Sequence, residues 1–159
     1  MHTTSRRADD IIRMAQPTTA KDARLLRDFS QLTHDHPELF ERLAALVQSR
    51  LTGNRAASVH ECFERLRWDI HIHMSNDLAP LLSRAVLYVH PDLNGMVKLT
   101  PRPLDELLGM RVSLKKQPGD YARRLEWCDG RPLTEAAPAQ KKPALPVSVQ
   151  GALFNGEAA

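Results

Sequence analysis

The chain contains few cysteine, glycine and aromatic residues, and each shortage excludes a class of protein. Its two cysteines, Cys62 and Cys128, are too few for a disulfide framework and lack the paired spacing of a zinc site, which favours a reducing compartment such as the cytoplasm. The seven glycines form no phosphate-binding loop. Only 5% of the residues are aromatic while eleven are proline, so we expect part of the chain to add little to a hydrophobic core.

Long apolar runs and strongly one-sided charge are also missing. No stretch approaches the roughly 18 apolar residues that cross a bilayer, and the first residues contain no apolar signal-peptide core, so we expect a soluble protein that is not exported. Lysine and arginine number 22 against 19 acidic residues, a formal net charge of +3. This balance lacks the dense positive charge of a histone-like nucleic-acid coat. With 42% apolar and 26% charged residues, the composition is that of a globular protein.

Apolar residues recur at steps of three and four through most of residues 21–108, which is the spacing of one face of a helix. Ser58 and Glu61 have the spacing of a capping box at a helix start, and Asn76 or Asp77 can cap the following helix. Pro37 separates two earlier helices, because proline interrupts a continuous helix. The expected helices span residues 21–34, 37–51, 58–74 and 77–90, with shorter ones at 9–14 and 103–108.

Beyond the helical region, the spacing changes to the alternation typical of β-strands. Apolar side chains alternate around Val112 and again across residues 121–127, on either side of turn-forming residues 117–120. Asp129-Gly130 can turn the chain once more, toward Pro132, although a proline limits a strand there to the edge of a sheet. We therefore expect a β-hairpin, or a meander of three strands.

Together these patterns predict a mainly α protein with a compact body of four to six helices. Residues 1–20 are expected to form an N-terminal arm or short helix, residues 21–108 the helical body, and residues 109–133 the β-hairpin or meander. Residues 134–159 contain too little bulky apolar material to offset the entropy lost on ordering. We expect this last segment to be a flexible, disordered tail.

The sequence contains no linear motif of an enzyme or a metal site. His34-Asp-His36 and Asp69-Ile-His71-Ile-His73 are metal candidates, but residues two apart on a helix point about 200° apart, so either histidine pair converges on one ion only where the backbone is extended. No Ser-His-Asp elbow or His-Glu-x-x-His pair is present. We therefore predict no catalytic residue, no metal and no cofactor, and a protein that is not an enzyme.

Basic residues are concentrated in the expected hairpin. The segment contains five cationic side chains and a single carboxylate, that of Asp120. The five are Arg111, Lys115, Lys116, Arg123 and Arg124. A basic hairpin after a helical body can hold cations against phosphates, as the wing of a winged-helix protein does, with an affinity that salt weakens. A solvated strand pair without a ligand explains the same residues, and both interpretations stay open.

The two helices that flank residues 52–57 also permit a helix-turn-helix arrangement. The helix that starts at Ser58 would then enter a groove, with Arg65 or Arg67 reaching the nucleic acid. Since these arginines lie two positions apart, they point to different sides of the helix. We expect at least one of them to form an ion pair with Glu61 or Glu64.

Three segments resemble a family of small uncharacterised phage and prophage proteins. They are Glu64-Arg-Leu-Arg-Trp68, residues 75–84 and His90-Pro-Asp-Leu-Asn-Gly95, within a region that covers residues 29–102. The family carries an Arg-Trp helix, then an Asn-rich segment and an Ala-Arg helix, whose aromatic part is replaced here by residues 81–83. The resemblance implies a compact helical phage protein, located in the cytoplasm of a bacterial host cell.

Near the end of the chain, Gln150-Gly-Ala-Leu-Phe154 resembles the Gln-x-x-Leu-Phe peptide by which bacterial replication and repair proteins attach to the DNA sliding clamp. In such a peptide, Leu153 and Phe154 fill apolar pockets while the Gln150 amide hydrogen-bonds at the entrance. Gly151 stands where the motif often has leucine, which should lower the affinity. Packing of Phe154 against the protein's own body is the alternative.

The leading hypothesis is therefore a non-catalytic phage accessory protein that binds the bacterial sliding clamp through Gln150, Leu153 and Phe154 and modulates host or phage DNA replication. The first alternative is a DNA-binding transcriptional regulator that uses the 58–74 helix and the basic hairpin. The second is an inhibitor of another host or defence protein, which would have much the same sequence.

Overall fold

The computed structural model describes residues 7–51, 56–71, 75–113, 122–135 and 137. These residues form a mainly helical fold with a small antiparallel hairpin, which confirms the predicted fold class. The α-helices are α1 (Asp10–Met14), α2 (Ala20–Asp35), α3 (Leu39–Arg50), α4 (Val59–Ile70), α5 (Ala79–Val89) and α6 (Pro103–Leu107). The 3-10 helices are η1 (Asn76–Leu78) and η2 (Pro91–Leu93), and the strands are β1 (Met110–Val112) and β2 (Leu125–Trp127).

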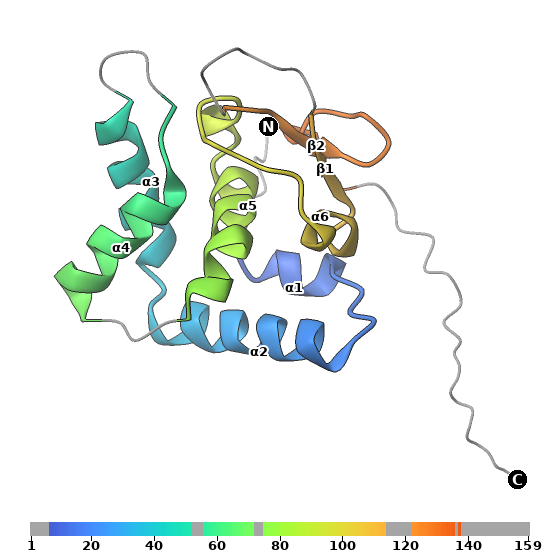
Figure 1. The fold of residues 1–159 in the computed structure, drawn as a ribbon, viewed down its shortest axis with the longest axis horizontal. Helices are drawn as coiled ribbons and strands as arrows, with labels where there is room; N and C mark the ends of the chain where they lie inside the picture. Colours follow the sequence, from blue (N-terminus) through green and yellow to red (C-terminus); the bar gives the residue numbers. More distant parts are fainter. Residues whose placement is uncertain (1–6, 52–55, 72–74, 114–121, 136, 138–159) are drawn as a thin grey trace, which may run out of the picture.

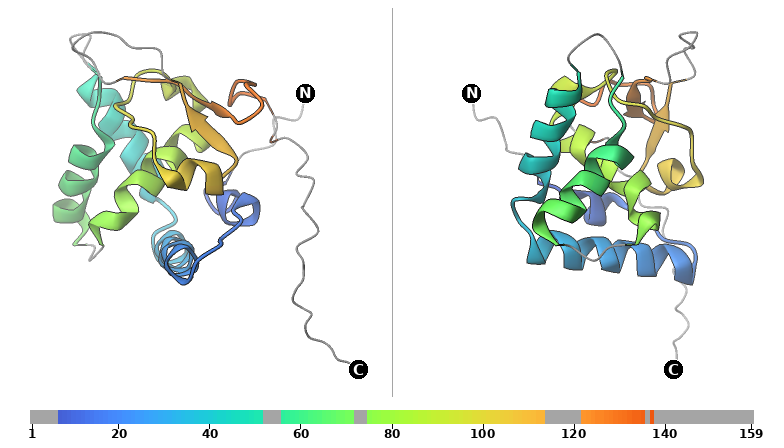
Figure 2. Two further views of the ribbon diagram at one scale, coloured as in Figure 1. Left: turned by 45° about the vertical axis from the view of Figure 1, so that its right-hand side comes forward. Right: turned by 60° about the vertical axis from the view of Figure 1, so that its left-hand side comes forward.

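Helix α5 lies at the centre of the fold. Helices α3 and α4 pack on one side of it, α6 and the strands lie on the other, and α2 crosses below (Figures 1 and 2). Because α5 is enclosed, every residue from 81 to 88 is buried, including Ser83 and Arg84. The sequence predicted a one-sided apolar stripe for this helix, whereas an enclosed helix buries its whole circumference.

Side-chain caps fix the starts of α2 and α4. The Asp22 backbone N–H donates to Thr19 Oγ1 at 3.0 Å, and the Glu61 N–H donates to Ser58 Oγ at 3.3 Å. The predicted cap at Ser58 is thereby confirmed. Helix α4 ends at Ile70, followed by His71 in the left-handed region with φ of 54°, and residues 72–74 of the predicted helix lie outside the described residues.

The start of the next helix differs from the prediction. Ser75, rather than Asn76 or Asp77, provides the capping side chain, since its Oγ accepts the Asp77 N–H at 3.2 Å. The reason is that η1 precedes α5, which moves the cap upstream of the residues expected to supply it. Pro80 lies in the first turn of α5, as predicted. Backbone N–H groups there have no acceptor within the helix, so the N–H that proline lacks costs no hydrogen bond.

Strands β1 and β2 pair antiparallel, with Met110 opposite Trp127. They span three residues each, less than the predicted alternation, and turn residues 117–120 lie outside the described residues. The other edge of β2 is completed by a side chain: the Leu125 N–H donates to Asn94 Oδ1 at 2.8 Å, and Asn94 Nδ2 donates to the Leu125 carbonyl at 2.7 Å. After the turn at Gly130, with φ of 87°, a single bridge joins Pro132 to β2 in place of a full third strand.

Packing continues past residue 134, where the tail was predicted to begin. Leu133 is fully buried in the same hydrophobic cluster as the helices and strands, and Ala137 packs against that cluster. The Trp127 indole N–H donates to the Glu135 carbonyl at 3.2 Å, so burial of the tryptophan requires this segment as its acceptor. None of the helices described here has both the length and the apolar character needed to cross a membrane.

Candidate functional site

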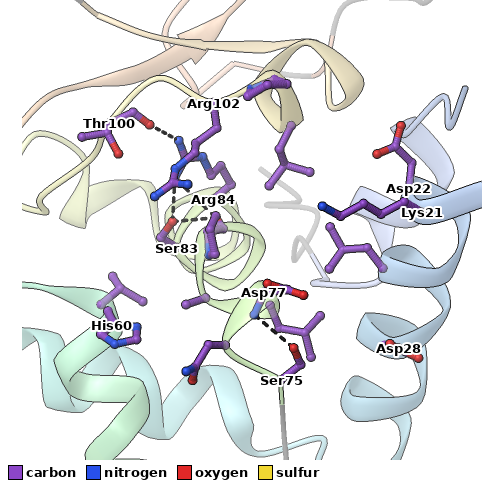
Figure 3. A pocket seen from close by; sticks show the side chains of 18 of the residues that line it. Lys21, Asp22, Asp28, His60, Ser75, Asp77, Ser83, Arg84, Thr100 and Arg102 are labelled. Carbon is purple, nitrogen blue, oxygen red and sulfur yellow. Dashed lines mark hydrogen bonds between the residues drawn. The ribbon is translucent and has the colours of Figure 1, made fainter. Parts of the chain in front are cut away.

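A pocket of about 830 Å³ lies between α2, the start of α4, η1 with the start of α5, and the segment of residues 98–104. Figure 3 shows Lys21 projecting from α2 into this space, Arg84 and Arg102 on one side of it, and Ser75 and Asp77 on another. Four parts of the chain that are distant in sequence therefore form one polar concavity.

Arg84, which lines the pocket, forms a buried ion pair with Asp105 behind it in the fold. Arg84 Nε lies 2.7 Å from Asp105 Oδ1, and both side chains are almost fully shielded from solvent. The guanidinium also donates to the Thr100 carbonyl at 2.6 Å and to Ser83 Oγ at 2.9 Å. Asp105 in turn accepts the Arg102 N–H at 2.9 Å, which caps α6. Arg84 therefore fixes the segment before α6 against α5, and its donors are satisfied within the protein.

Cations without ion-pair partners line the rest of the pocket. Lys21 and Arg24 come from α2, and Lys98 and Arg102 from the segment that Arg84 holds. None of the four forms an ion pair within the residues that the structure describes. Lys98 alternates with the buried Val97 and Leu99, and this alternation directs its side chain away from the core.

The pocket also contains carboxylates and the start of a long helix. Asp22 and Asp28 lie on α2 and Asp77 lies on η1, each outside any ion pair of the described chain. Ser58 and His60 line it from the first turn of α4, where the helix dipole is positive. The arrangement can bind a polar ligand that carries negative charge at one end and hydrogen-bond donors at the other.

The predicted groove-binding arginines of α4 have intramolecular partners. Arg67 Nη1 lies 2.7 Å from Glu64 Oε1 and donates to Asn76 Oδ1 at 3.0 Å, and its guanidinium lies over the Phe63 ring. The expected ion pair with Glu64 is confirmed. Arg65 Nε lies 3.6 Å from Asp69 on a more exposed side of the helix, so the two arginines do point to different sides.

The predicted cations of the hairpin are only partly described. Arg124 is exposed and its side chain lies against Gly95, while the Arg123 N–H donates to the Val97 carbonyl at 3.3 Å. Arg111 Nε pairs with Glu126 Oε1 across the two strands at 2.9 Å. Lys115 and Lys116 lie outside the described residues, as do Gln150, Leu153 and Phe154 of the clamp-like peptide.

The two cysteine thiols do not line the pocket: Cys62 is buried and Cys128 is exposed elsewhere on the protein. Desolvation raises the pKa of the buried Cys62 thiol, against the opposing effect of Arg50. Desolvation also raises the pKa of Cys128, whose Sγ donates to the Met110 carbonyl at 3.3 Å. No group of three or more histidine, cysteine or carboxylate side chains that could hold a metal occurs in the described ranges.

Sequence reasoning missed the pocket, because its residues belong to four separate segments with no shared motif. One signal was present: Arg84 stands inside the apolar run Leu81-Leu-Ser-Arg-Ala-Val-Leu-Tyr88. A charge in an enclosed helix needs a partner, so this run indicates a buried ion pair. Asp105 could not be identified as that partner without the fold. Trp68, at the end of the segment that resembles the phage family, is exposed, with 77% of its surface accessible.

Comparison with protein-family models, with curated proteins and with solved structures gave no match to this chain.

Proposed function

We propose that the protein is a non-catalytic phage accessory protein that binds the DNA sliding clamp of its bacterial host. The observation that carries the proposal is the peptide Gln150-Gly-Ala-Leu-Phe154, in which three residues match the Gln-x-x-Leu-Phe pattern. Bound at the clamp in the host cytoplasm, the protein would modulate replication of host or phage DNA.

The organisation of the chain supports this proposal. Leu133 and Ala137 complete the packing of the body, and the Trp127 indole finds its acceptor at Glu135. The clamp-like peptide follows this packed region in the sequence. A short peptide attached to a folded body suits a clamp pocket, which takes up only a few side chains.

Two apolar anchors set the expected strength of binding. Burial of a leucine or phenylalanine side chain contributes about 1.5–3 kcal/mol, while ordering the peptide on the clamp opposes binding. The Gln150 amide adds a hydrogen bond at the pocket entrance. These contributions amount to about 4–7 kcal/mol before the ordering cost is subtracted, less than the roughly 8 kcal/mol of a micromolar complex, so we expect a dissociation constant of about 0.1 mM.

The direct test uses a fluorescent peptide of residues 145–159 and a purified bacterial sliding clamp. Fluorescence polarisation should show saturable binding with a dissociation constant of about 0.1 mM, weakened about tenfold or more by Leu153→Ala or by Phe154→Ala. Asn155→Ala lies next to the motif and provides the matched control, which should bind as the parent peptide does. Absence of binding, or equal binding by all four peptides, would contradict the proposal.

A DNA-binding regulator is the second candidate, favoured by the basic residues that immediately precede β2. Arg123 and Arg124 form no ion pair within the described chain, and Lys115 and Lys116 add two cations to the same predicted hairpin. Arg67 is held by Glu64 and Asn76, which weighs against α4 as a recognition helix. The hairpin is therefore the part of this hypothesis to test.

Gel retardation of duplex DNA by the full chain tests it. If the hairpin binds phosphates, the shift should weaken as salt rises and should be lost when Lys115, Lys116, Arg123 and Arg124 are all replaced by alanine. Arg27→Ala removes an exposed cation on α2 and should leave the shift unchanged. A shift that survives the fourfold substitution excludes the hairpin as the binding surface.

A further inference from the structure

The pocket beside Arg84 has the size of an organic ligand rather than of a simple ion. Its volume of about 830 Å³ lies within the roughly 300–1,000 Å³ that small-molecule sites occupy. Phosphate alone would fill a small part of it. The walls come from α2, α4, η1 with α5, and residues 98–104, so the concavity is built by the fold and not by one loop.

One side of the pocket is suited to an anion. Lys21 extends from α2 into the space with the Asp22 carboxylate beside it, and Arg102 lies across from Lys21 near Arg84 (Figure 3). Lys98 precedes Thr100 by two positions, so both side chains leave the segment on the side that lines the pocket. The Arg84 guanidinium is itself saturated, but its bonds to Thr100 and Asp105 hold the backbone that carries Lys98 and Arg102.

The opposite side is suited to hydrogen-bond donors. Asp28 and Asp77 approach the pocket from α2 and η1, away from Arg84 and Arg102 (Figure 3). These carboxylates would repel a bare anion, since charges of like sign disfavour one another. They accept hydrogen bonds from amino or hydroxyl groups. Ser75 lies beside Asp77, whose backbone N–H donates to the Ser75 hydroxyl, and His60 lines the pocket from α4 (Figure 3).

We propose that this pocket binds a phosphorylated small molecule with hydrogen-bond donors at its other end, the chemistry of a nucleotide. Its phosphate lies among Lys21, Lys98 and Arg102, where charge-assisted hydrogen bonds from ammonium and guanidinium groups hold it. Its amino or hydroxyl groups face Asp28 and Asp77. The proposal is independent of clamp binding, because it uses none of residues 150–154.

Isothermal titration of the full chain tests the site with chemically graded probes. The probes are inorganic phosphate, pyrophosphate, the four common nucleoside 5'-monophosphates and the corresponding nucleosides. At least one nucleoside monophosphate should bind about tenfold more tightly than both phosphate and its own nucleoside, because only the nucleotide uses both sides of the pocket. Saturable binding of one molecule per chain is expected.

Two paired variants separate the sides of the pocket. Lys21→Ala with Arg102→Ala should weaken nucleotide binding about tenfold or more, whereas Arg13→Ala with Arg27→Ala removes two exposed cations elsewhere and should leave it unchanged. Asp28→Asn with Asp77→Asn should strengthen the binding of phosphate and pyrophosphate, since repulsion is removed. A general disturbance of the fold would weaken binding in both double variants, so it cannot explain weaker binding in one and stronger binding in the other.

Three results would contradict the proposal. Equal weakening by the control pair would show that overall charge, and not the pocket, holds the phosphate. No binding of any probe up to millimolar concentration would exclude the site. Tighter binding of a single-stranded oligonucleotide than of every mononucleotide, lost in the Lys21→Ala, Arg102→Ala protein, would assign these cations to nucleic acid and overturn the small-molecule proposal.

Discussion

At the scale of single residues, the Arg84–Asp105 pair has the greatest effect on the fold. Its two side chains are almost fully buried, and each makes further hydrogen bonds to the backbone around α6. A buried charge that keeps its partner is tolerated, whereas one that loses it faces the full cost of desolvation. The pair therefore specifies how residues 100–105 sit on α5.

Replacing one residue of the Arg84–Asp105 pair should destabilise the protein far more than replacing both. Arg84→Met leaves the Asp105 carboxylate buried without its counter-ion and should lower the free energy of unfolding by about 3–5 kcal/mol. Adding Asp105→Asn removes the stranded charge while keeping an acceptor for the Arg102 N–H, so it should restore part of the loss. Urea unfolding of the parent protein, the two single variants and the double variant measures the coupling energy between Arg84 and Asp105. Strictly additive losses in the free energy of unfolding would contradict this account.

The two thiols should differ in reactivity in the folded protein. Cys62 is buried and should resist alkylation, whereas the exposed Cys128 should react. Desolvation raises the pKa of Cys128, so its thiolate fraction near pH 8 is below that of an unperturbed thiol and its rate should rise only at higher pH. Iodoacetamide labelling against pH, read by mass spectrometry, checks both points. Equal labelling of Cys62 and Cys128 without denaturant would be inconsistent with the packing around α4.

At the scale of elements, local sequence signals predicted most helices, and long-range pairing explains what they missed. Ser58 starts α4 as expected, because a capping box depends on residues three apart. The cap before α5 was placed too late, since a 3-10 turn is fixed by packing more than by propensity. The outer edge of β2 was predicted only in part: the chain returns to it at Pro132 as expected, but the side chain of Asn94, thirty-one residues from Leu125, could not be identified as its other partner.

The bond between Asn94 and β2 can be tested by substitution. Asn94→Ala removes an acceptor for the Leu125 N–H and a donor for its carbonyl, leaving both buried groups unpaired. We expect a loss of about 2–4 kcal/mol in the free energy of unfolding. Asp92→Ala, an exposed change in the adjoining 3-10 helix, should alter it by about 0.5 kcal/mol or less. Similar stability of the two variants would show that Asn94 does not secure the strand.

At the scale of the whole molecule, the helices and the hairpin share one hydrophobic core. Trp127 of β2 packs edge-to-face on Tyr88 of α5, and Leu133 joins the same cluster. This sharing was not visible in the sequence, where the change from helical to alternating spacing suggested two successive parts. The body accordingly continues to at least Ala137, and the clamp-like peptide lies beyond it.

Truncation distinguishes the body from residues 138–159. A chain that ends at Ala137 should unfold within about 2 °C of the full chain, because it keeps Leu133 and the Glu135 acceptor. A chain that ends at Gly130 loses burial of Leu133, worth about 1.5–3 kcal/mol, and leaves the Trp127 indole N–H unpaired at a further cost of about 1–3 kcal/mol. Differential scanning calorimetry gives the comparison. Marked destabilisation of the longer truncated chain would show that residues after 137 contribute to the fold.

The most direct measurement of the central claim compares the full chain and the 145–159 peptide on the same purified sliding clamp. If a clamp-binding peptide follows an independent body, calorimetry should give dissociation constants that agree within about threefold, and Leu153→Ala with Phe154→Ala should abolish binding of the full chain. The amide spectrum of residues 7–137 should be unchanged in that variant. Clamp binding that survives the double substitution, or a full chain that does not bind although the peptide does, would contradict the account.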